Sequence, residues 1–206
     1  MQTTHPIESA IGDPTWEITE LFPRQGHWSE AEYLLLQTNR LIELSNGKLE
    51  VLRLPTQSHQ LILRSLYRLF DDFVTSHKLG LVLFAPLRVK LWDGTIREPD
   101  IVFMREANTD RRSDDYWTGA DLALEVVSKF DPKRDLETKL HEYAEAGIPE
   151  CWIVDPRNAT ITVFKLESAG QRYAEVGVYK PGEFAASVLL EGLTIDVAAV
   201  FAAANE

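Results

Sequence analysis

The chain has one cysteine among its 206 residues and no uninterrupted apolar run approaching the ~18 residues of a membrane helix. A single cysteine excludes an intramolecular disulfide and every zinc motif built on several cysteines. Cys151 lies in the apolar run 151–154, so we expect a small core side chain rather than a nucleophile. Residues 1–19 also lack a basic stretch followed by an apolar core, which leads us to expect a cytoplasmic protein without a membrane segment.

Positive charge is scarce as well. The 21 Lys and Arg residues face 32 Asp and Glu residues, and the formal net charge is -11. Such a chain offers no global attraction to a phosphate backbone, so any contact with nucleic acid has to be local. A Walker-type loop, a G-x-G-x-x-G motif, a G-x-S-x-G elbow and a histidine pair at metal-binding i,i+4 spacing are all missing from the sequence.

What is present indicates one compact unit. With 45% hydrophobic and 26% charged residues, a chain of 206 residues can bury one sizeable core. Neither a repeat nor a low-complexity linker marks a boundary. We therefore expect a single domain over residues 1–206, with its core at about 28–166.

The N-terminal third contains well-marked local signals. Residues 28–36 predict a short helix that Ser29 caps, with Glu32 completing a capping box. The segments 40–45 and 48–53 predict a hairpin, because Asn46-Gly47 suits a type I′ turn. From about 57 to 78, apolar residues at helical spacing predict a helix with one buried stripe, formed by Ile62, Leu63, Leu66, Leu69, Phe70 and Phe73.

The rest of the chain alternates strands with one further central helix. Strands are predicted at 81–91, 99–104, 121–128, 150–154 and 159–166, and peripheral strands with a short Ala-rich helix at 171–206. A helix at about 132–146 is framed by Asp131 as N-cap, Pro132 and Gly147. The fold class is therefore α/β or α+β, with mixed pairing in one sheet, because only the last central strand follows a helical crossover.

Two carboxylates are the first candidates for chemistry. Asp100 opens one predicted strand and Glu125 lies within the next, so adjacent strands would bring them to one sheet edge. Two hard oxygen ligands suit Mg²⁺ or Mn²⁺, and Glu125 has apolar neighbours on both sides, where an unpaired charge is costly. The structural alternatives are that Asp100 caps a turn and that Glu125 pairs with an arginine.

Lys139 is the third candidate. It stands three residues after Leu136 and four before Tyr143, which places it beside the apolar stripe of its helix, within reach of the sheet. The alternative is an exposed pair with Asp135.

Two further residues are weaker candidates. His59 precedes Ile62 and Leu63 by one helical turn and should face the sheet, as a metal ligand, an orienting group or a core or capping histidine. Glu43 alternates with Ile42 and Leu44 and so points to the opposite face of its strand.

An ordered set of motifs carries a family resemblance. It comprises Pro99-Asp100, Glu125-Val126-Val127-Ser128, Asp135 with Lys139, Tyr143, and the run at 147–156, Gly-Ile-Pro-Glu-Cys-Trp-Ile-Val-Asp-Pro. Together they resemble the large family of uncharacterised bacterial restriction-endonuclease-like proteins of the PD-(D/E)XK nuclease superfamily. The resemblance covers about 28–166, and the family's hairpin and first-helix histidine look like residues 41–52 and His59.

The resemblance implies a four-stranded mixed sheet between two helices and a site for Mg²⁺ or Mn²⁺. The metal would be held by Asp100, Glu125 and the Val126 carbonyl, with Asp100, Glu125 and Lys139 as catalytic residues and His59 and Glu43 in support. The sequence departs from the superfamily at Val127, where the catalytic lysine usually stands, and Lys139 is the natural substitute. The run at 129–132, Lys-Phe-Asp-Pro, also departs from the Ser/Pro/Thr-rich turn of relatives.

The expected activity is metal-dependent hydrolysis of phosphodiester bonds, with DNA as the expected substrate. Lys129, Lys133 and Arg134 could contact phosphates. We expect a homodimer, because cutting two strands needs two sites, and Trp16, Trp28 and Trp117 could supply exposed contacts. Two alternatives stay open: a nuclease-fold binding or regulatory module without turnover, and a metal-free hydrolase that uses Asp100 and Glu125 as glycosidases use their carboxyl pair.

Overall fold

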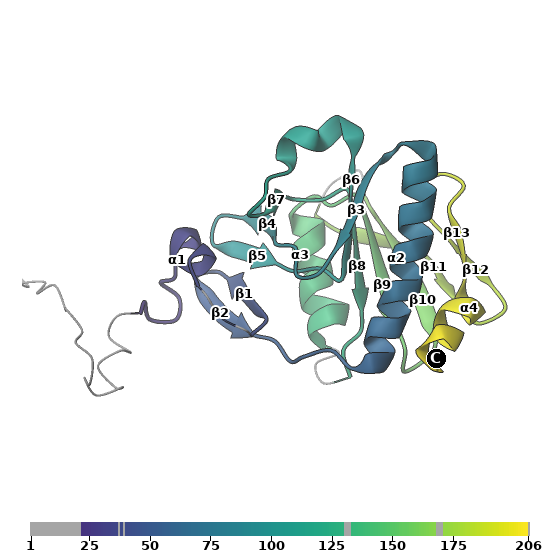
Figure 1. Ribbon diagram of the computed structural model, residues 1–206, viewed down its shortest axis with the longest axis horizontal. Helices are drawn as coiled ribbons and strands as arrows, with labels where there is room; N and C mark the ends of the chain where they lie inside the picture. Colours follow the sequence, from purple (N-terminus) through teal and green to yellow (C-terminus); the bar gives the residue numbers. More distant parts are fainter. Residues whose placement is uncertain (1–21, 37, 39, 130–132, 168–170, 206) are drawn as a thin grey trace, which may run out of the picture.

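A six-stranded mixed sheet forms the centre of the protein (Figure 1), in a computed structural model that describes residues 22–36, 38, 40–129, 133–167 and 171–205. Its strand order is β11-β10-β9-β8-β6-β3, and only β8 and β9 run parallel. The predicted fold class and mixed pairing are confirmed. The strands are β3 (Gly80–Phe84), β6 (Ile101–Arg105), β8 (Leu122–Val126), β9 (Glu150–Asp155), β10 (Thr160–Leu166) and β11 (Tyr173–Tyr179).

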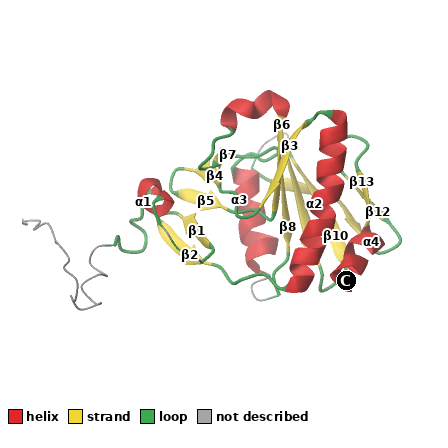
Figure 2. Ribbon diagram, in the orientation of Figure 1, coloured by secondary structure: helices red, strands yellow, loops and turns green. Residues whose placement is uncertain are grey.

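The helix α2 (Gln57–His77) covers one face of this sheet (Figures 1 and 2). Thr56 caps it by accepting a hydrogen bond from the His59 N–H group, and the helix ends at Lys78 in the left-handed conformation. The bounds agree with the predicted range. The buried stripe differs from the predicted one, because Leu69 is 39% exposed, Phe73 is only partly buried and Val74 is buried. The stripe consists of Ile62, Leu63, Leu66, Phe70 and Val74.

The opposite face is covered by the second central helix. It consists of the π-helical segment η3 (Arg134–Lys139) and α3 (Leu140–Glu145). The sequence predicted a helix here, but not the π-helical part, and the expected cap at 131–132 lies outside the described residues. The helix ends as predicted at Gly147, which has a φ of 76°. Its N–H group donates to the Ala144 carbonyl at 3.0 Å, as in a Schellman motif.

Alternation along the strands divides the core between these two helices. Ile101 and Leu124 pack in the cluster that contains α2, whereas Val102 and Ala123 pack in the cluster that contains Tyr143 of α3. Neighbouring strand residues point to opposite faces, so each strand serves both layers.

A second sheet lies beside the first, with the strand order β2-β1-β5-β4-β7. Asn46 and Gly47 both have positive φ angles, which confirms the predicted hairpin turn. The helix α1 (Glu30–Leu34) has the predicted capping box between Ser29 and Glu32. The strands are β1 (Ile42–Ser45), β2 (Lys48–Val51), β4 (Val89–Trp92), β5 (Thr95–Arg97) and β7 (Trp117–Thr118).

Two expectations about this region are wrong. The run 81–91 is not one strand, because it breaks at Pro86 and its halves, β3 and β4, belong to different sheets. Trp28 and Trp117 are buried, so neither offers a dimer contact, and Trp16 lies outside the described residues. The strand β5 was not predicted, although it carries a residue that matters for the site.

The C-terminal segment packs onto the layer that contains α2. The 3-10 segments are η2 (Glu106–Arg111) and η4 (Ala203–Asn205), and the remaining elements are β12 (Phe184–Ala186), β13 (Thr194–Asp196) and α4 (Val197–Ala202). The buried carboxylate of Glu150 accepts hydrogen bonds from the Ser187 hydroxyl at 2.6 Å and from the Leu189 N–H group at 2.7 Å. It therefore ties this segment to β9. Within the described ranges, no helix has the length and apolar character needed to cross a bilayer.

Candidate metal centre

Asp100 and Glu125 come together where β6 begins and β8 ends. Ile101 pairs with Leu124 in the antiparallel register, and continuing that register by one residue sets Asp100 opposite Glu125. The Asp100 carboxylate accepts a hydrogen bond from the Val126 N–H group at 2.8 Å. Asp100 is thus bonded across to β8 and does not merely cap a turn after Pro99.

Glu125 is almost fully buried and is bound by two residues of the second central helix. The Lys139 ammonium donates to both of its carboxylate oxygens at 2.9 Å, and the Tyr143 hydroxyl donates to one of them. Lys139 and Tyr143 lie one helical turn apart, which lets both side chains reach the same acceptor. Burial and the charge of Glu125 raise the pKa of Tyr143 well above its ordinary value, so its hydroxyl remains a donor.

These contacts bear on the structural alternatives predicted for Lys139 and Glu125. Lys139 is only 4% exposed, so its ammonium lies in the interior and not on the solvated surface. Glu125 does form a buried ion pair, and Lys139 is a cation that the structure places on it.

His59 approaches the carboxylates from α2. Its Nε2 atom lies 3.2 Å from the Asp100 Oδ2 atom. Burial lowers the pKa of His59, but a hydrogen bond to Asp100, the charges of Asp100 and Glu125 and a hydrogen bond with the Val126 backbone raise it, and the net direction is upward. Within the described residues, the buried Nδ1 atom of His59 has no hydrogen-bond partner.

The residues present fit a hard divalent cation. No group of three His, Cys, Asp or Glu side chains with metal-binding geometry occurs in the described part of the chain. The family resemblance implies a donor set of two carboxylates and the Val126 carbonyl, and the register of β6 and β8 sets the two carboxylates side by side. Carboxylate oxygens of this kind suit Mg²⁺ or Mn²⁺.

Arg97 was missed by the sequence reasoning, although it organises the surroundings of the site. It is 1% exposed and donates to both Glu142 oxygens, at 2.7 and 2.6 Å. It also donates to Glu50 at 2.7 Å, to Glu43 at 3.1 Å and to the Ser45 hydroxyl at 3.1 Å. The guanidinium thus joins β5 to the β1–β2 hairpin and to α3.

Glu43 is fully buried and adjoins Lys139, whose ammonium lies 3.5 Å from its Oε1 atom. Arg134 contacts both Glu43 and Glu50. Of the three residues expected to contact phosphate, Arg134 is thus engaged with carboxylates, whereas Lys129 is exposed and Lys133 forms only an exposed pair with Glu137 at 3.8 Å.

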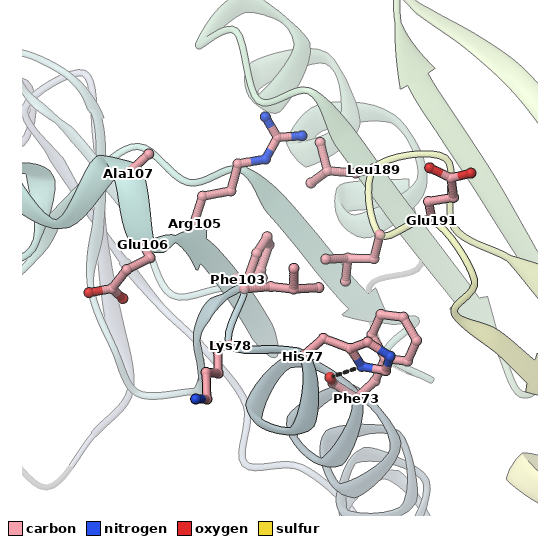
Figure 3. A pocket seen from close by; sticks show the side chains of 11 residues that line it. Phe73, His77, Lys78, Phe103, Arg105, Glu106, Ala107, Leu189 and Glu191 are labelled. Atoms are coloured by element: carbon pink, nitrogen blue, oxygen red, sulfur yellow. Dashed lines mark hydrogen bonds between the residues drawn. The ribbon is translucent and has the colours of Figure 1, made fainter.

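A cavity of about 390 Å³ lies elsewhere, at the C-terminal end of α2 (Figure 3). His77 at this end is 18 residues from His59, or roughly 27 Å along the helix. Glu106 and Glu191 point to different sides of the cavity (Figure 3), so its carboxylates do not converge. The lining residues are Phe73, His77, Lys78, Leu79, Phe103, Arg105, Glu106, Ala107, Leu189, Leu190 and Glu191.

The mixed sheet between two helices, with paired carboxylates on adjacent strands, defines a nuclease-like fold of the restriction-endonuclease type. The chain belongs to the family described as "Uma2: Putative restriction endonuclease", whose model matches residues 28–198. Among solved structures, a putative nuclease belonging to DUF820 from Anabaena variabilis matches with a TM-score of 0.70 and 17% identity, over 85% of this chain and 98% of that chain. At that identity the likeness concerns the fold alone. No curated protein matches the chain.

Replacing Arg97 should be severely destabilising. In Arg97→Met, the buried carboxylates of Glu43 and Glu142 lose their shared cation, and we expect the free energy of unfolding to fall by about 3–5 kcal/mol. Lys133→Met, which removes an exposed pair, is the control and should change it by less than about 0.5 kcal/mol. Urea unfolding measures both. Equal, small effects would show that the Arg97 network does not support the fold.

Glu98 should make stability depend on pH. Burial, together with the negative charge of Glu43, raises its pKa from 4.5 to about 7, against the opposing effects of Arg88, Lys139 and Tyr33. Because the folded state binds this proton more tightly, the resulting stability is fully present below pH 4.5 and is lost as pH rises through 7. A pKa shift of this size corresponds to roughly 3 kcal/mol of folding free energy.

The comparison of wild type with Glu98→Gln tests this dependence. Between pH 4.5 and 8, the wild-type free energy of unfolding should fall by about 3 kcal/mol relative to that variant. Glu137→Gln, at an exposed position, should follow the wild type. Parallel profiles for wild type and Glu98→Gln would contradict the raised pKa.

Proposed function

We propose that this protein is a divalent-metal-dependent endonuclease that hydrolyses phosphodiester bonds in DNA. The observation that carries the proposal is the meeting of Asp100, Glu125 and the Val126 backbone beside a buried lysine that binds Glu125. Membership of a family described as putative restriction endonucleases supports the nuclease reading and favours DNA as substrate.

The proposed roles follow from the contacts of each residue. Asp100, Glu125 and the Val126 carbonyl would hold Mg²⁺ or Mn²⁺ on the edge shared by β6 and β8. When bound there, such an ion lowers the pKa of a coordinated water and offsets negative charge on the scissile phosphate. Lys139 lies beside both Glu125 and Glu43, and its ammonium would orient the attacking water or stabilise charge that develops on the phosphate.

His59 supports the site by holding Asp100 through its Nε2 atom. Lys129 and Lys133 are the exposed cations next to the second central helix, and we assign them to flanking phosphates. A second cavity, of about 320 Å³, is lined by Glu50, Lys133, Arg134 and Thr138, which adds room for a backbone segment on this side. These local positive charges would offset the repulsion between DNA and a chain with a net charge of -11.

We also propose that two copies act together, because a double-strand cut needs two sites. The strand β2 is an edge strand of its sheet, and Val51 on it and Leu54 just beyond it are 55% and 71% exposed. An unpaired strand edge that carries an exposed apolar side chain is a ready pairing surface. Light scattering should give the mass of two chains for the wild type and of one chain for Val51→Lys, and a monomeric wild type at micromolar concentration would contradict the proposal.

The carboxylate pair provides the test of activity. In Asp100→Ala, Glu125→Ala, we expect Mn²⁺-dependent cleavage of plasmid DNA to drop at least about 10³-fold, because the proposed ligands are gone. Glu106→Ala changes a carboxylate that is 70% exposed and lies in η2, and it should cleave like the wild type. Cleavage that survives in the double variant would refute the assignment. Activity on sugars that resists EDTA would favour the glycosidase-like alternative instead.

A further inference from the structure

Glu43 is held on every side by nitrogen donors. Its Oε1 atom accepts a hydrogen bond from the Glu98 N–H group at 3.0 Å and faces Lys139, whereas Arg97 and Arg134 contact its Oε2 atom. Burial raises the pKa of Glu43, but the charges of Lys139, Arg134 and Arg97 lower it, and the net direction is downward. Glu43 is therefore an ionised carboxylate whose oxygens already have partners.

This environment does not suit a metal ligand. A divalent cation on Glu43 would have to displace a guanidinium or the Lys139 ammonium, and it would be repelled by the remaining positive charges. The supporting role that the family resemblance implies for Glu43 is therefore better filled without direct contact to the metal. Its connection to the candidate metal centre runs through Lys139.

Lys139 lies between two carboxylates, Glu125 and Glu43, and is closer to Glu125. Its Nζ atom is 2.9 Å from each Glu125 oxygen and 3.5 Å from Glu43 Oε1. A cation that binds Glu125 competes with the ammonium for the same oxygens and repels it. Glu43 Oε1 is a second carboxylate oxygen within ion-pair distance, and a small movement of the flexible lysine side chain would turn the 3.5 Å contact into a hydrogen bond.

We propose that Glu43 is a positioning residue that receives the Lys139 ammonium when a divalent cation binds Glu125. The two carboxylates are alternative partners of one lysine, and the affinity of the site for metal is set by the competition between them. This inference rests on the metal centre of the proposed function, but it concerns binding and not cleavage.

A double-mutant cycle on Mn²⁺ affinity, measured by calorimetry, tests the proposal. Lys139→Met removes the competitor and should bind Mn²⁺ about tenfold more tightly than the wild type. Glu43→Gln removes the alternative partner, leaves Lys139 on Glu125 and should bind about tenfold more weakly. In the Lys139→Met background, Glu43→Gln should change the affinity by less than about twofold. If Glu43 were a ligand, the same loss would occur in both backgrounds, and that result would overturn the proposal.

Glu142→Gln is the matched control. This variant changes another buried carboxylate that accepts hydrogen bonds from Arg97. It leaves both Glu43 and Lys139 in place. We expect wild-type Mn²⁺ affinity for this variant. A loss equal to that of Glu43→Gln would mean that the effect arises from the Arg97 network, and the proposal would fail.

A crystal of the wild-type protein soaked in Mn²⁺ keeps the test independent of variants that fail to fold. Lys139 Nζ should lie closer to Glu43 Oε1 than to either Glu125 oxygen, with no Mn²⁺ on Glu43. Density for Mn²⁺ on Glu43, or Mn²⁺ bound while both Lys139–Glu125 bonds persist, would overturn the proposal, as would the absence of Mn²⁺ binding to both wild type and Lys139→Met.

The proposed nuclease activity and the proposed movement of Lys139 can be refuted separately. A non-additive cycle with no DNA cleavage by the wild type would keep the movement and refute the nuclease. Metal-dependent cleavage with an additive cycle would keep the nuclease and refute the movement.

Discussion

The buried guanidinium of Arg97 is the interaction on which the arrangement of the site depends. It binds Glu142 with two parallel hydrogen bonds and binds Glu43 and Glu50 through another nitrogen. Bidentate pairing of this kind fixes direction as well as distance. Since Glu142 belongs to α3 and Glu43 to β1, Arg97 sets how the smaller sheet stands relative to the helix that carries Lys139. The Glu125 carboxylate of β8 therefore binds a lysine whose helix is held from outside the main sheet.

Electrostatic balance also explains why so many charges can be buried here. Asp100 has His59, Glu125 has Lys139, and Glu43 has contacts with Arg97, Arg134 and Lys139. Each carboxylate has at least one cation within ion-pair distance, which lowers the cost of removing it from water. The two carboxylates proposed to hold metal have a histidine and a lysine as partners, whereas Glu43 also has two arginines.

Local signals in the sequence predicted much of this fold. Asn46-Gly47, the capping box at Ser29 and the glycine at 147 each act through the backbone of a few neighbouring residues, and each was placed correctly. Asp100 and Glu125 could be paired because they lie on strands that follow one another in the sheet. Arg97 could not be placed, since β5 has only three residues and the partners of Arg97 lie 45 to 54 positions away. The split of 81–91 between two sheets escaped prediction for the same reason, because its apolar pattern continues across Pro86.

The π-helical turn before α3 has a consequence for the composition of the site. Residues five apart, such as Arg134 and Lys139, would point about 140° away from each other on a regular α-helix. A π-helical turn closes its hydrogen bonds between residues five apart and so stacks them on one side. Both side chains accordingly reach Glu43. The two cations thus share one side of the helix because a single turn contains one extra residue. Deleting that residue would rotate one of the two side chains out of the interior, although both cations would still be present in the sequence.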